Sequence, residues 1–249
     1  MSAKVSCPVL NQGWGEEIPL PAVTVAHREE AWRMLGLGEY FQTYILLPRE
    51  QYQWLMRPLA ELEIQAQRIA NFGCGDGRET LTLACMLRAC EAAGVDKDEQ
   101  NIRNAQSTLK TIQNIIWVKG SPNDAPIFLR QPCLEEVVRF YPVDIANKST
   151  DLPSNYYDFA FCDFVLYHIW LDQGGENKTQ TAIREMVRVV RSGGVVAARE
   201  PTRRTGKPAF EMDFEPLFER NGLKPIHVEP TLFECGQNTE YLYLKDNAA

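Results

Sequence analysis

From about Arg68 onward, short apolar runs alternate with segments of helical periodicity, and this alternation leaves few fold classes open. It is typical of a parallel sheet covered by helices on both faces, because parallel strands need a crossover that is usually a helix. Helices are expected over Thr80 to Ala89, Asp98 to Leu109 and Thr181 to Val190. Five runs are expected to be strands: Arg68 to Phe72, Glu91 to Val95, Val138 to Val143, Tyr157 to Phe164 and Val195 to Glu200.

The C-terminal part departs from this alternation. A last helix is expected over Glu215 to Arg220, ended by Asn221-Gly222. The extended runs Lys224 to Glu229 and Glu240 to Lys245 follow without a helical crossover between them, so they are expected to form an antiparallel pair. The prediction for residues 67–249 is therefore an α/β core: a Rossmann-like seven-stranded sheet with helices on both faces and an antiparallel last strand.

The N-terminal part has a different character. Helix-like stretches occur around Glu29 to Leu35 and Pro48 to Gln67, and residues 1–66 are interpreted as a helical cap or lid on the core, since a separate domain of that size is disfavoured. Its aromatic side chains either line a pocket or seal the cap against the sheet, with the second interpretation favoured. These are Trp14, Trp32, Tyr40, Phe41, Tyr44, Tyr52 and Trp54.

Composition excludes several classes of protein. With 45% hydrophobic and 24% charged residues the chain is an ordinary globular one, and no run approaches the roughly 18 apolar residues of a membrane helix. Met1 to Trp14 lacks the pattern of a secretory signal, so a soluble, cytoplasmic protein is expected. The net charge of −7 disfavours nonspecific binding to nucleic acid or membrane. The seven cysteines form no CxxC pair, so neither disulfides nor a metal site is expected.

A glycine-rich loop, Asn71-Phe72-Gly73-Cys74-Gly75-Asp76-Gly77, lies between an expected strand and an expected helix. Glycines there allow a sharp turn and close approach of a ligand to the backbone, while the helix N-terminus offers free N–H groups. A carboxylate, Asp96, ends the next strand, 21 residues after Gly75, about where a ribose diol would be bound. The alternative is an ordinary strand-to-helix turn without a ligand.

Glycine spacing separates two classes of cofactor. A dinucleotide site requires GxGxxG/A, but Arg78 occupies the last position of that motif and the loop reads GxGxG. This spacing favours a ligand with a ribose and an amino-acid tail over a nicotinamide dinucleotide.

The chain resembles the class I S-adenosylmethionine-dependent methyltransferases, over roughly Arg68 to Lys245. The glycine loop is similar to the family's first motif, and Gly94-Val95-Asp96 to the acidic end of its second strand. Further matches are Val143-Asp144-Ile145 with Leu152-Pro153, Tyr157 to His168 as the fourth-strand motif, and Arg188 to Gly194, which resembles the family's "RVLkPGG" turn.

The resemblance implies S-adenosyl-L-methionine as cofactor and assigns residues to it. Asp96 would accept the ribose hydroxyls with Lys97 beside the adenine, and Asp144 would accept from the adenine amino group. Asp163 would face the methionine ammonium or the substrate, although Asp144 and Asp163 are also placed to cap following helices. The full set of expected cofactor residues is Asn71, Gly73, Cys74, Gly75, Gly77, Asp96, Lys97, Asp144, Ile145 and Asp163.

Two departures from the family pattern stand out. The family usually begins its glycine motif with a carboxylate that reaches the methionine ammonium through water, whereas this chain has Asn71. In addition, 48 positions separate Asp96 from Asp144, more than one helix and turn require. The excess, near Thr111 to Pro132, is expected to be an added surface element or part of a substrate lid.

Candidate catalytic and substrate residues lie past the strand ends. His168, with Tyr167 beside it, is the best candidate for a general base, with a structural histidine as the alternative. Arg203 and Arg204, in a basic segment from Arg199 to Lys207 taken as a loop, and Tyr44 of the cap are candidates for substrate contact.

The predicted function is methyl transfer by in-line displacement to O, N or C of a small organic acceptor. No Asn/Asp-Pro-Pro-Tyr motif follows the fourth expected strand, and with the acidic charge this disfavours nucleic acid as a partner. Two alternatives are an NAD(P)-dependent oxidoreductase and a catalytically silent module that binds S-adenosylmethionine. The sequence does not indicate the oligomeric state.

Overall fold

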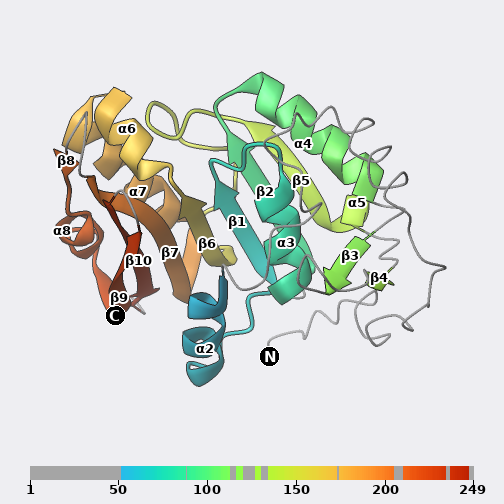
Figure 1. The fold of residues 1–249 in the computed structure, drawn as a ribbon, viewed down its shortest axis with the longest axis horizontal. Coiled ribbons are helices and arrows are strands. Elements are labelled where there is room, and N and C mark those ends of the chain that lie inside the picture. Colours follow the sequence, from blue (N-terminus) through green and yellow to red (C-terminus); the bar gives the residue numbers. More distant parts are fainter. Residues whose placement is uncertain are drawn as a thin grey trace.

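The computed structural model describes residues 52–87, 89–112, 116–119, 127–129, 134–172, 174–204, 210–233 and 236–246. Its main sheet has seven strands in the order β5-β2-β1-β6-β7-β10-β9, with the two-residue strand β8 (Phe210–Glu211) beside β7 (Figure 1). Strands β5, β2, β1, β6 and β7 are mutually parallel, whereas β10 is antiparallel to both β7 and β9. The predicted seven-stranded sheet with an antiparallel last strand is confirmed.

Each of the seven strands overlaps the apolar run that predicts it, and the last three of the seven along the chain are longer than expected. The strands are β1 (Arg68–Phe72), β2 (Glu91–Asp96), β5 (Val138–Pro142), β6 (Tyr157–Asp163), β7 (Val190–Arg204), β9 (Leu223–Phe233) and β10 (Gly236–Lys245). Successive side chains point to opposite faces of the sheet. Phe159 and Phe161 of β6 therefore belong to one apolar core, while Ala160 and Cys162 belong to another.

Helices cover both faces. The first core holds α2 (Gln53–Glu61), α3 (Arg78–Leu87), α4 (Glu99–Ile112) and α5 (Leu134–Val137), and the second holds α6 (Leu166–Asp172), α7 (Gly175–Val189) and α8 (Glu215–Glu219). Helix α7 begins six residues before the expected Thr181, because its first turns are polar and give no apolar periodicity. No helix among these is long and apolar enough to cross a membrane.

Strand β7 corrects two expectations. The turn expected before it is an irregular start of the strand, where Gly193 has a φ of 71° and a Cβ on Gly194 would lie 2.8 Å from the Asp158 carbonyl oxygen. The basic segment beyond Glu200, where the strand was expected to end in a loop, continues as strand to Arg204. It does so because β10 pairs with it as far as Gly236, opposite Arg204, and β8 pairs on its other side.

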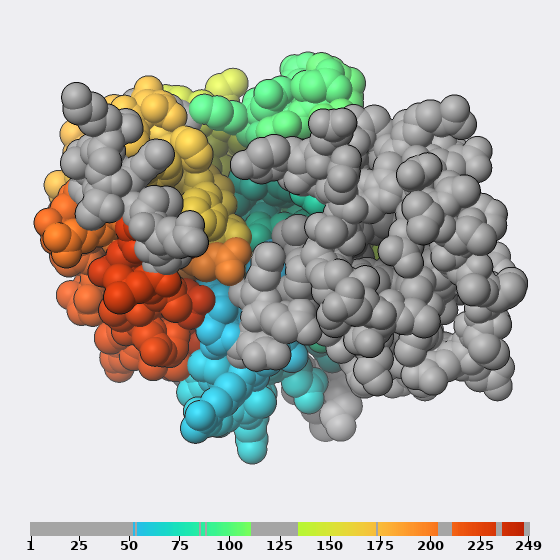
Figure 2. Space-filling model, viewed as in Figure 1, coloured from blue at the N-terminus to red at the C-terminus, as the bar shows by residue number. Residues whose placement is uncertain are grey.

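Helix α2 packs the end of the predicted cap onto the sheet. Tyr52 and Leu55 are buried in the first core, and the Trp54 ring stacks on His227 of β9 at a centroid distance of 6.1 Å. Figure 2 shows α2 in cyan next to the red C-terminal strands. For Tyr52 and Trp54, sealing against the sheet is therefore the observed role. Residues 1–51, with the other cap aromatics, lie outside the described residues, and the domain boundary at 66 stays a prediction.

The long connection between β2 and β5 carries an added element. Within it, β3 (Ile116–Lys119) and β4 (Ile127–Leu129) form a two-stranded antiparallel sheet, separate from the main sheet (Figure 1). The described part of the 111–132 segment thus agrees with an added element, and a role as lid stays a prediction.

Candidate functional site

The carboxyl ends of the parallel strands meet at one edge of the sheet, where α/β proteins bind their ligands. The glycine loop follows β1 at this edge. The N–H groups of Gly73 and Cys74 donate to the Val95 carbonyl oxygen at 2.6 and 2.9 Å, which holds the loop against the end of β2. Backbone hydrogen bonds thus fix the conformation of the loop. A preformed binding site requires such a loop.

Two glycines of this loop have different reasons to be glycine. Gly73 has a φ of 74°, and a Cβ there would lie 2.1 Å from Val165 Cγ2, so no larger residue fits without movement. Gly75 also has a positive φ, 53°, but no heavy atom lies within 4 Å of its ideal Cβ. The loop is therefore packed at Gly73 and open at Gly75.

Asp96 lies beside that open position. Its side chain is buried in the edge, where Oδ2 accepts from the Gly75 N–H and Oδ1 accepts from the Asp98 N–H, both at 2.9 Å. Oδ1 also accepts from Asn101 Nδ2 at 3.3 Å. A carboxylate oxygen has two acceptor sites, so Oδ2 retains capacity for a ligand hydroxyl. Lys97, expected beside the adenine, is exposed next to it.

Asp144 and Ile145 follow β5 at the same edge. The Asp144 carboxylate accepts from the Ala146 N–H at 3.0 Å and from Asn147 Nδ2 at 2.7 Å, which closes a turn that leaves Ile145 buried. The preceding residue, Val143, donates its N–H to the Asp96 carbonyl oxygen at 2.8 Å. The loops after β2 and β5 are therefore joined, and the two expected cofactor carboxylates belong to one edge.

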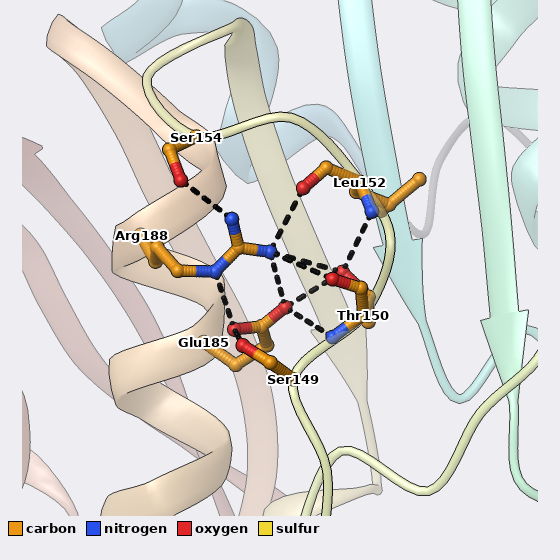
Figure 3. A network of polar contacts seen from close by, with 6 residues as sticks. All are labelled: Ser149, Thr150, Leu152, Ser154, Glu185 and Arg188. Atoms are coloured by element: carbon orange, nitrogen blue, oxygen red, sulfur yellow. Dashed lines mark hydrogen bonds and ion pairs between the residues drawn. The ribbon is translucent and has the colours of Figure 1, made fainter.

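A polar clamp, Glu185 and Arg188 of α7 with Ser149, Thr150, Leu152 and Ser154, fixes the chain that follows (Figure 3). Glu185 accepts from the Thr150 N–H at 2.7 Å and from the Arg188 guanidinium, which also donates to the Leu152 carbonyl oxygen at 2.9 Å. Burial opposes ionisation of Glu185, but the hydrogen bonds from Arg188 and Thr150 lower its pKa overall. The clamp thus anchors residues 149–154, which follow Asp144 and Ile145 in the chain.

A second polar group, Tyr52, Asn71, Glu79, Asp163 and Arg199, forms a buried cluster at the edge. Asn71 has no exposed surface and donates from Nδ2 to Glu79 Oε2 at 2.8 Å, while the Tyr52 hydroxyl donates to Glu79 Oε1 at 2.9 Å. Glu79, in the first turn of α3, was not predicted as a site residue. Burial and the nearby Asp163 carboxylate raise its pKa to about 8.

Asp163 and Arg199 complete this buried cluster from β6 and β7. The Arg199 guanidinium forms a two-pronged ion pair with Asp163, with Nε 2.9 Å from Oδ1 and Nη2 on Oδ2. Burial raises the pKa of Asp163, against the lowering effects of Arg199 and of a hydrogen bond with Glu79. Arg199, expected at the end of a strand and the start of a basic segment, is the cation that the described residues bring to this cluster.

Glu200 was also missed, and it corrects the idea that Asp163 caps the following helix. The Glu200 carboxylate accepts from the N–H groups of Val165 and Leu166, both at 3.0 Å, and of Tyr167 at 3.1 Å. Its complete burial raises its pKa to about 8, against the effect of these three donors. The N-terminus of α6 is thus capped from the neighbouring strand.

The candidate base lies on α6 and points away from the core. The His168 side chain is 62% exposed, and its Nδ1 is 3.4 Å from Asp172 Oδ2. The Tyr167 ring contacts the His168 ring at a centroid distance of 4.9 Å. Both follow the end of β6 as expected, and their place in catalysis stays a prediction.

Of the three residues expected to contact substrate, the structure describes the side chain of one. Arg203 is exposed on β7, whereas the side chain of Arg204 and the whole of Tyr44 lie outside the described residues. In the described part of the chain, no group of three or more His, Cys, Asp or Glu side chains is arranged to hold a metal ion.

Comparison with known proteins agrees with this arrangement. A ribosomal protein L11 methyltransferase from Stenotrophomonas maltophilia (strain R551-3) is 31% identical over 138 residues, which cover 54% of this chain and only 40% of that protein. The structure of the N-methyltransferase NodS from Bradyrhizobium japonicum WM9 with S-adenosyl-L-homocysteine covers 88% of this chain and 98% of its own, with a TM-score of 0.57 and 16% identity. Magnesium protoporphyrin IX methyltransferase from Synechocystis PCC 6803 with bound SAM covers 88% of this chain and 91% of its own, with a TM-score of 0.53 and 16% identity.

The two structural likenesses establish the fold, and the sequence family establishes the class of enzyme. The family described as a methyltransferase domain matches residues 70–198, which are just over half of the chain and run from β1 through the glycine loop to β7. This match sets the dinucleotide alternative aside. The chain belongs to the class I S-adenosylmethionine-dependent methyltransferases.

Proposed function

We propose that this methyltransferase acts on O, N or C of a small organic acceptor, which binds at the carboxyl edge of the sheet beside the glycine loop. Bound S-adenosylmethionine supplies an electrophilic methyl group on a sulfonium. The chain's own contribution is to bind the reactants, align them for in-line displacement and exclude water. Nucleic acid is not proposed as the acceptor, because the net charge of −7 opposes binding to phosphates.

The residues at the edge fit this cofactor. The open position at Gly75 and the remaining acceptor capacity of Asp96 suit a ribose. Asp144 and the apolar Ile145 suit an adenine, with Lys97 beside it. Asn71, Gly73, Cys74, Gly77 and Asp163 line the amino-acid side of the proposed site.

Phe164 is the observation that favours a small organic acceptor. It follows Asp163 at the end of β6, has a φ of 59° and is 38% exposed. A bulky residue in the left-handed region is strained, and such strain concentrates at functional sites. The conformation exposes a large apolar ring at the edge, which suits the apolar face of an organic molecule.

An acceptor that arrives protonated requires a base, and we propose His168 for this role, with Tyr167 as a second polar group. His168→Ala is then expected to lower the single-turnover rate by about 10²-fold while the affinity for S-adenosyl-L-homocysteine is unchanged. Lys148→Ala, an exposed change on the 144–152 loop, is the matched control. An unaltered rate in His168→Ala would remove the histidine from the mechanism.

A protein acceptor is the second candidate, favoured by the identity with the ribosomal protein L11 methyltransferase. The two are separated by incubating the enzyme with methyl-labelled S-adenosylmethionine and either the dialysable or the protein fraction of a cell extract. The proposal predicts label in products of low mass that depend on the enzyme. Label found solely in protein would replace the small-molecule acceptor with a polypeptide.

A further inference from the structure

The buried cluster of Tyr52, Asn71, Glu79, Asp163 and Arg199 contains more acceptors and more acidic groups than its own cation satisfies. Glu79 and Asp163 contribute two carboxyl groups, and Arg199 contributes one guanidinium, which is paired with Asp163. Glu240 of β10 also faces Arg199, and the two side chains interact electrostatically. An isolated buried charge is costly, so the cluster without a ligand is expected to hold a proton in place of a missing cation.

A second observation points to a ligand group at the same place. Asn71 Oδ1 is buried and has no hydrogen-bond partner among the described residues, although the same amide donates from Nδ2 to Glu79. An unpaired buried acceptor of this kind costs about 1–3 kcal/mol and calls for a donor. The missing group is thus both a cation and a hydrogen-bond donor, as a primary ammonium is.

The cluster adjoins the glycine loop. Asn71, at the start of the loop, donates to Glu79 at 2.8 Å, and the Gly75 N–H of the same loop donates to Asp96 at 2.9 Å. Glu79 and the proposed ribose site at Asp96 are therefore held by the same short loop, through residues four positions apart.

Resting on the proposed function, we infer that the ammonium of the cofactor's amino-acid tail binds at Glu79 and Asn71 and displaces a proton shared by Glu79 and Asp163. Glu79 thereby supplies the carboxylate that position 71 lacks. The proton passes from the Glu79–Asp163 pair to the solvent, and no bond other than that O–H bond changes.

The surrounding groups fix the direction of the pH effect. Those facing Glu79 or its partners are Tyr52, the residue before α2, Cys74 of the loop, Cys162 and Asp163 of β6, Arg199 and Glu200 of β7, and Glu240 of β10. With the pKa of Glu79 raised to about 8, ligand binding must remove a proton below that pH. Affinity for an ammonium-bearing ligand therefore rises with pH up to about 8, by at most about tenfold per unit.

The test is calorimetry of S-adenosyl-L-homocysteine binding near pH 7 in buffers of different ionisation enthalpy, which gives the number of protons released. The unaltered protein is expected to release about one proton. The analogue 5′-methylthioadenosine, which lacks the ammonium, is expected to bind with no release. This pair of ligands tests the inference without any variant.

Variants sharpen the result. Glu79→Gln should bind S-adenosyl-L-homocysteine with no proton release. The matched control is Glu91→Gln. It removes a carboxylate that accepts a hydrogen bond from Tyr156 at the opposite end of the strands. This variant should release protons on binding as the unaltered protein does. Equal release with both ligands, or undiminished release by Glu79→Gln, would overturn the inference. Failure of the unaltered protein to bind S-adenosyl-L-homocysteine would instead overturn the proposed function.

Discussion

The polar clamp on α7 and the buried cluster at the carboxyl edge are built from similar groups, but they differ in how fully their hydrogen-bond acceptors are paired. In the clamp, Glu185 accepts from five donors, and Arg188 donates to Glu185 and to three residues of the 149–154 segment. In the buried cluster, Asn71 Oδ1 has no partner among the described residues and Glu79 has a raised pKa.

This difference indicates which buried polar network is the better candidate for a ligand site. A saturated network such as the clamp lowers the pKa of its acid, because the ionised form is fully compensated. In the buried cluster, burial and the Asp163 carboxylate raise the pKa of Glu79, and the acceptor Asn71 Oδ1 stays without a partner among the described residues. By the criterion of an unused buried acceptor, the clamp is a positioning device and the buried cluster is the binding surface that we propose.

The largest expected effect comes from breaking the clamp. Glu185→Gln removes an ionised carboxylate and leaves Arg188 without its counter-charge, so the free energy of unfolding should fall by about 2–3 kcal/mol, reduced from the value for full burial because Arg188 is 29% exposed. Urea unfolding measures it. The same change at Glu176, whose ion pair with Arg220 on the surface is half exposed, should cost less than about 0.5 kcal/mol. Equal losses in the two variants would contradict the difference drawn between clamp and surface.

For each pH unit, a smaller effect is expected from titration of the buried cluster. Glu79 has a folded-state pKa of about 8 against an ordinary value of 4.5. Between these values the folded protein holds a proton that the unfolded chain does not, so stability falls as pH rises from about 5 to 8 and this contribution levels off above 8. The slope from one group is at most about 1.4 kcal/mol per pH unit.

Unfolding by urea at several pH values checks this slope. Glu79→Gln should remove the contribution of Glu79 to the slope of stability against pH. The contribution of Glu200, whose pKa is also about 8, should remain. A slope that Glu79→Gln leaves unaltered would show that Glu79 is ionised in the folded protein without its ligand.

The smallest expected effect is at the rim of the clamp. Ser154 is exposed and accepts one hydrogen bond from Arg188 Nη1 at 2.6 Å, so Ser154→Ala should cost about 0.5 kcal/mol or less. Thermal unfolding of Ser154→Ala and Glu185→Gln in parallel measures the ratio of their losses in stability. A loss at Ser154 as large as that at Glu185 would mean that the clamp's rim, and not its carboxylate, holds the segment.

The sequence predicts the sheet well because its signals are local. Apolar runs bounded by polar residues place β1 and β2 within one residue, and the glycine loop with Asp96 follows from spacing alone. The start of α7 and the length of β7 are missed, because polar first turns and strand pairing at a distance leave no local pattern.

The site is predicted less completely for the same reason. Glu79 and Glu200 are buried carboxylates in the folded protein, yet a charged residue just before an expected helix or at the end of an expected strand resembles a surface residue in the sequence. The sequence contains one signal for Glu79. Because Asn71 stands where the family usually has a carboxylate, a carboxylate from another position is expected nearby. Arg199 carried no such signal, because its partner Asp163 is 36 residues away and meets it across the register of β6 and β7.

Asp96 offers the most direct test of cofactor binding at this edge. Calorimetry should show S-adenosyl-L-homocysteine binding to the unaltered protein with one site per chain, and Asp96→Asn should weaken it by about tenfold or more through loss of charge-assisted hydrogen bonds. Asp98→Asn, at an exposed neighbour whose carboxylate caps the Gln100 N–H, should leave the affinity unaltered. Equal affinities for all three proteins would contradict the assignment of this edge as the cofactor site.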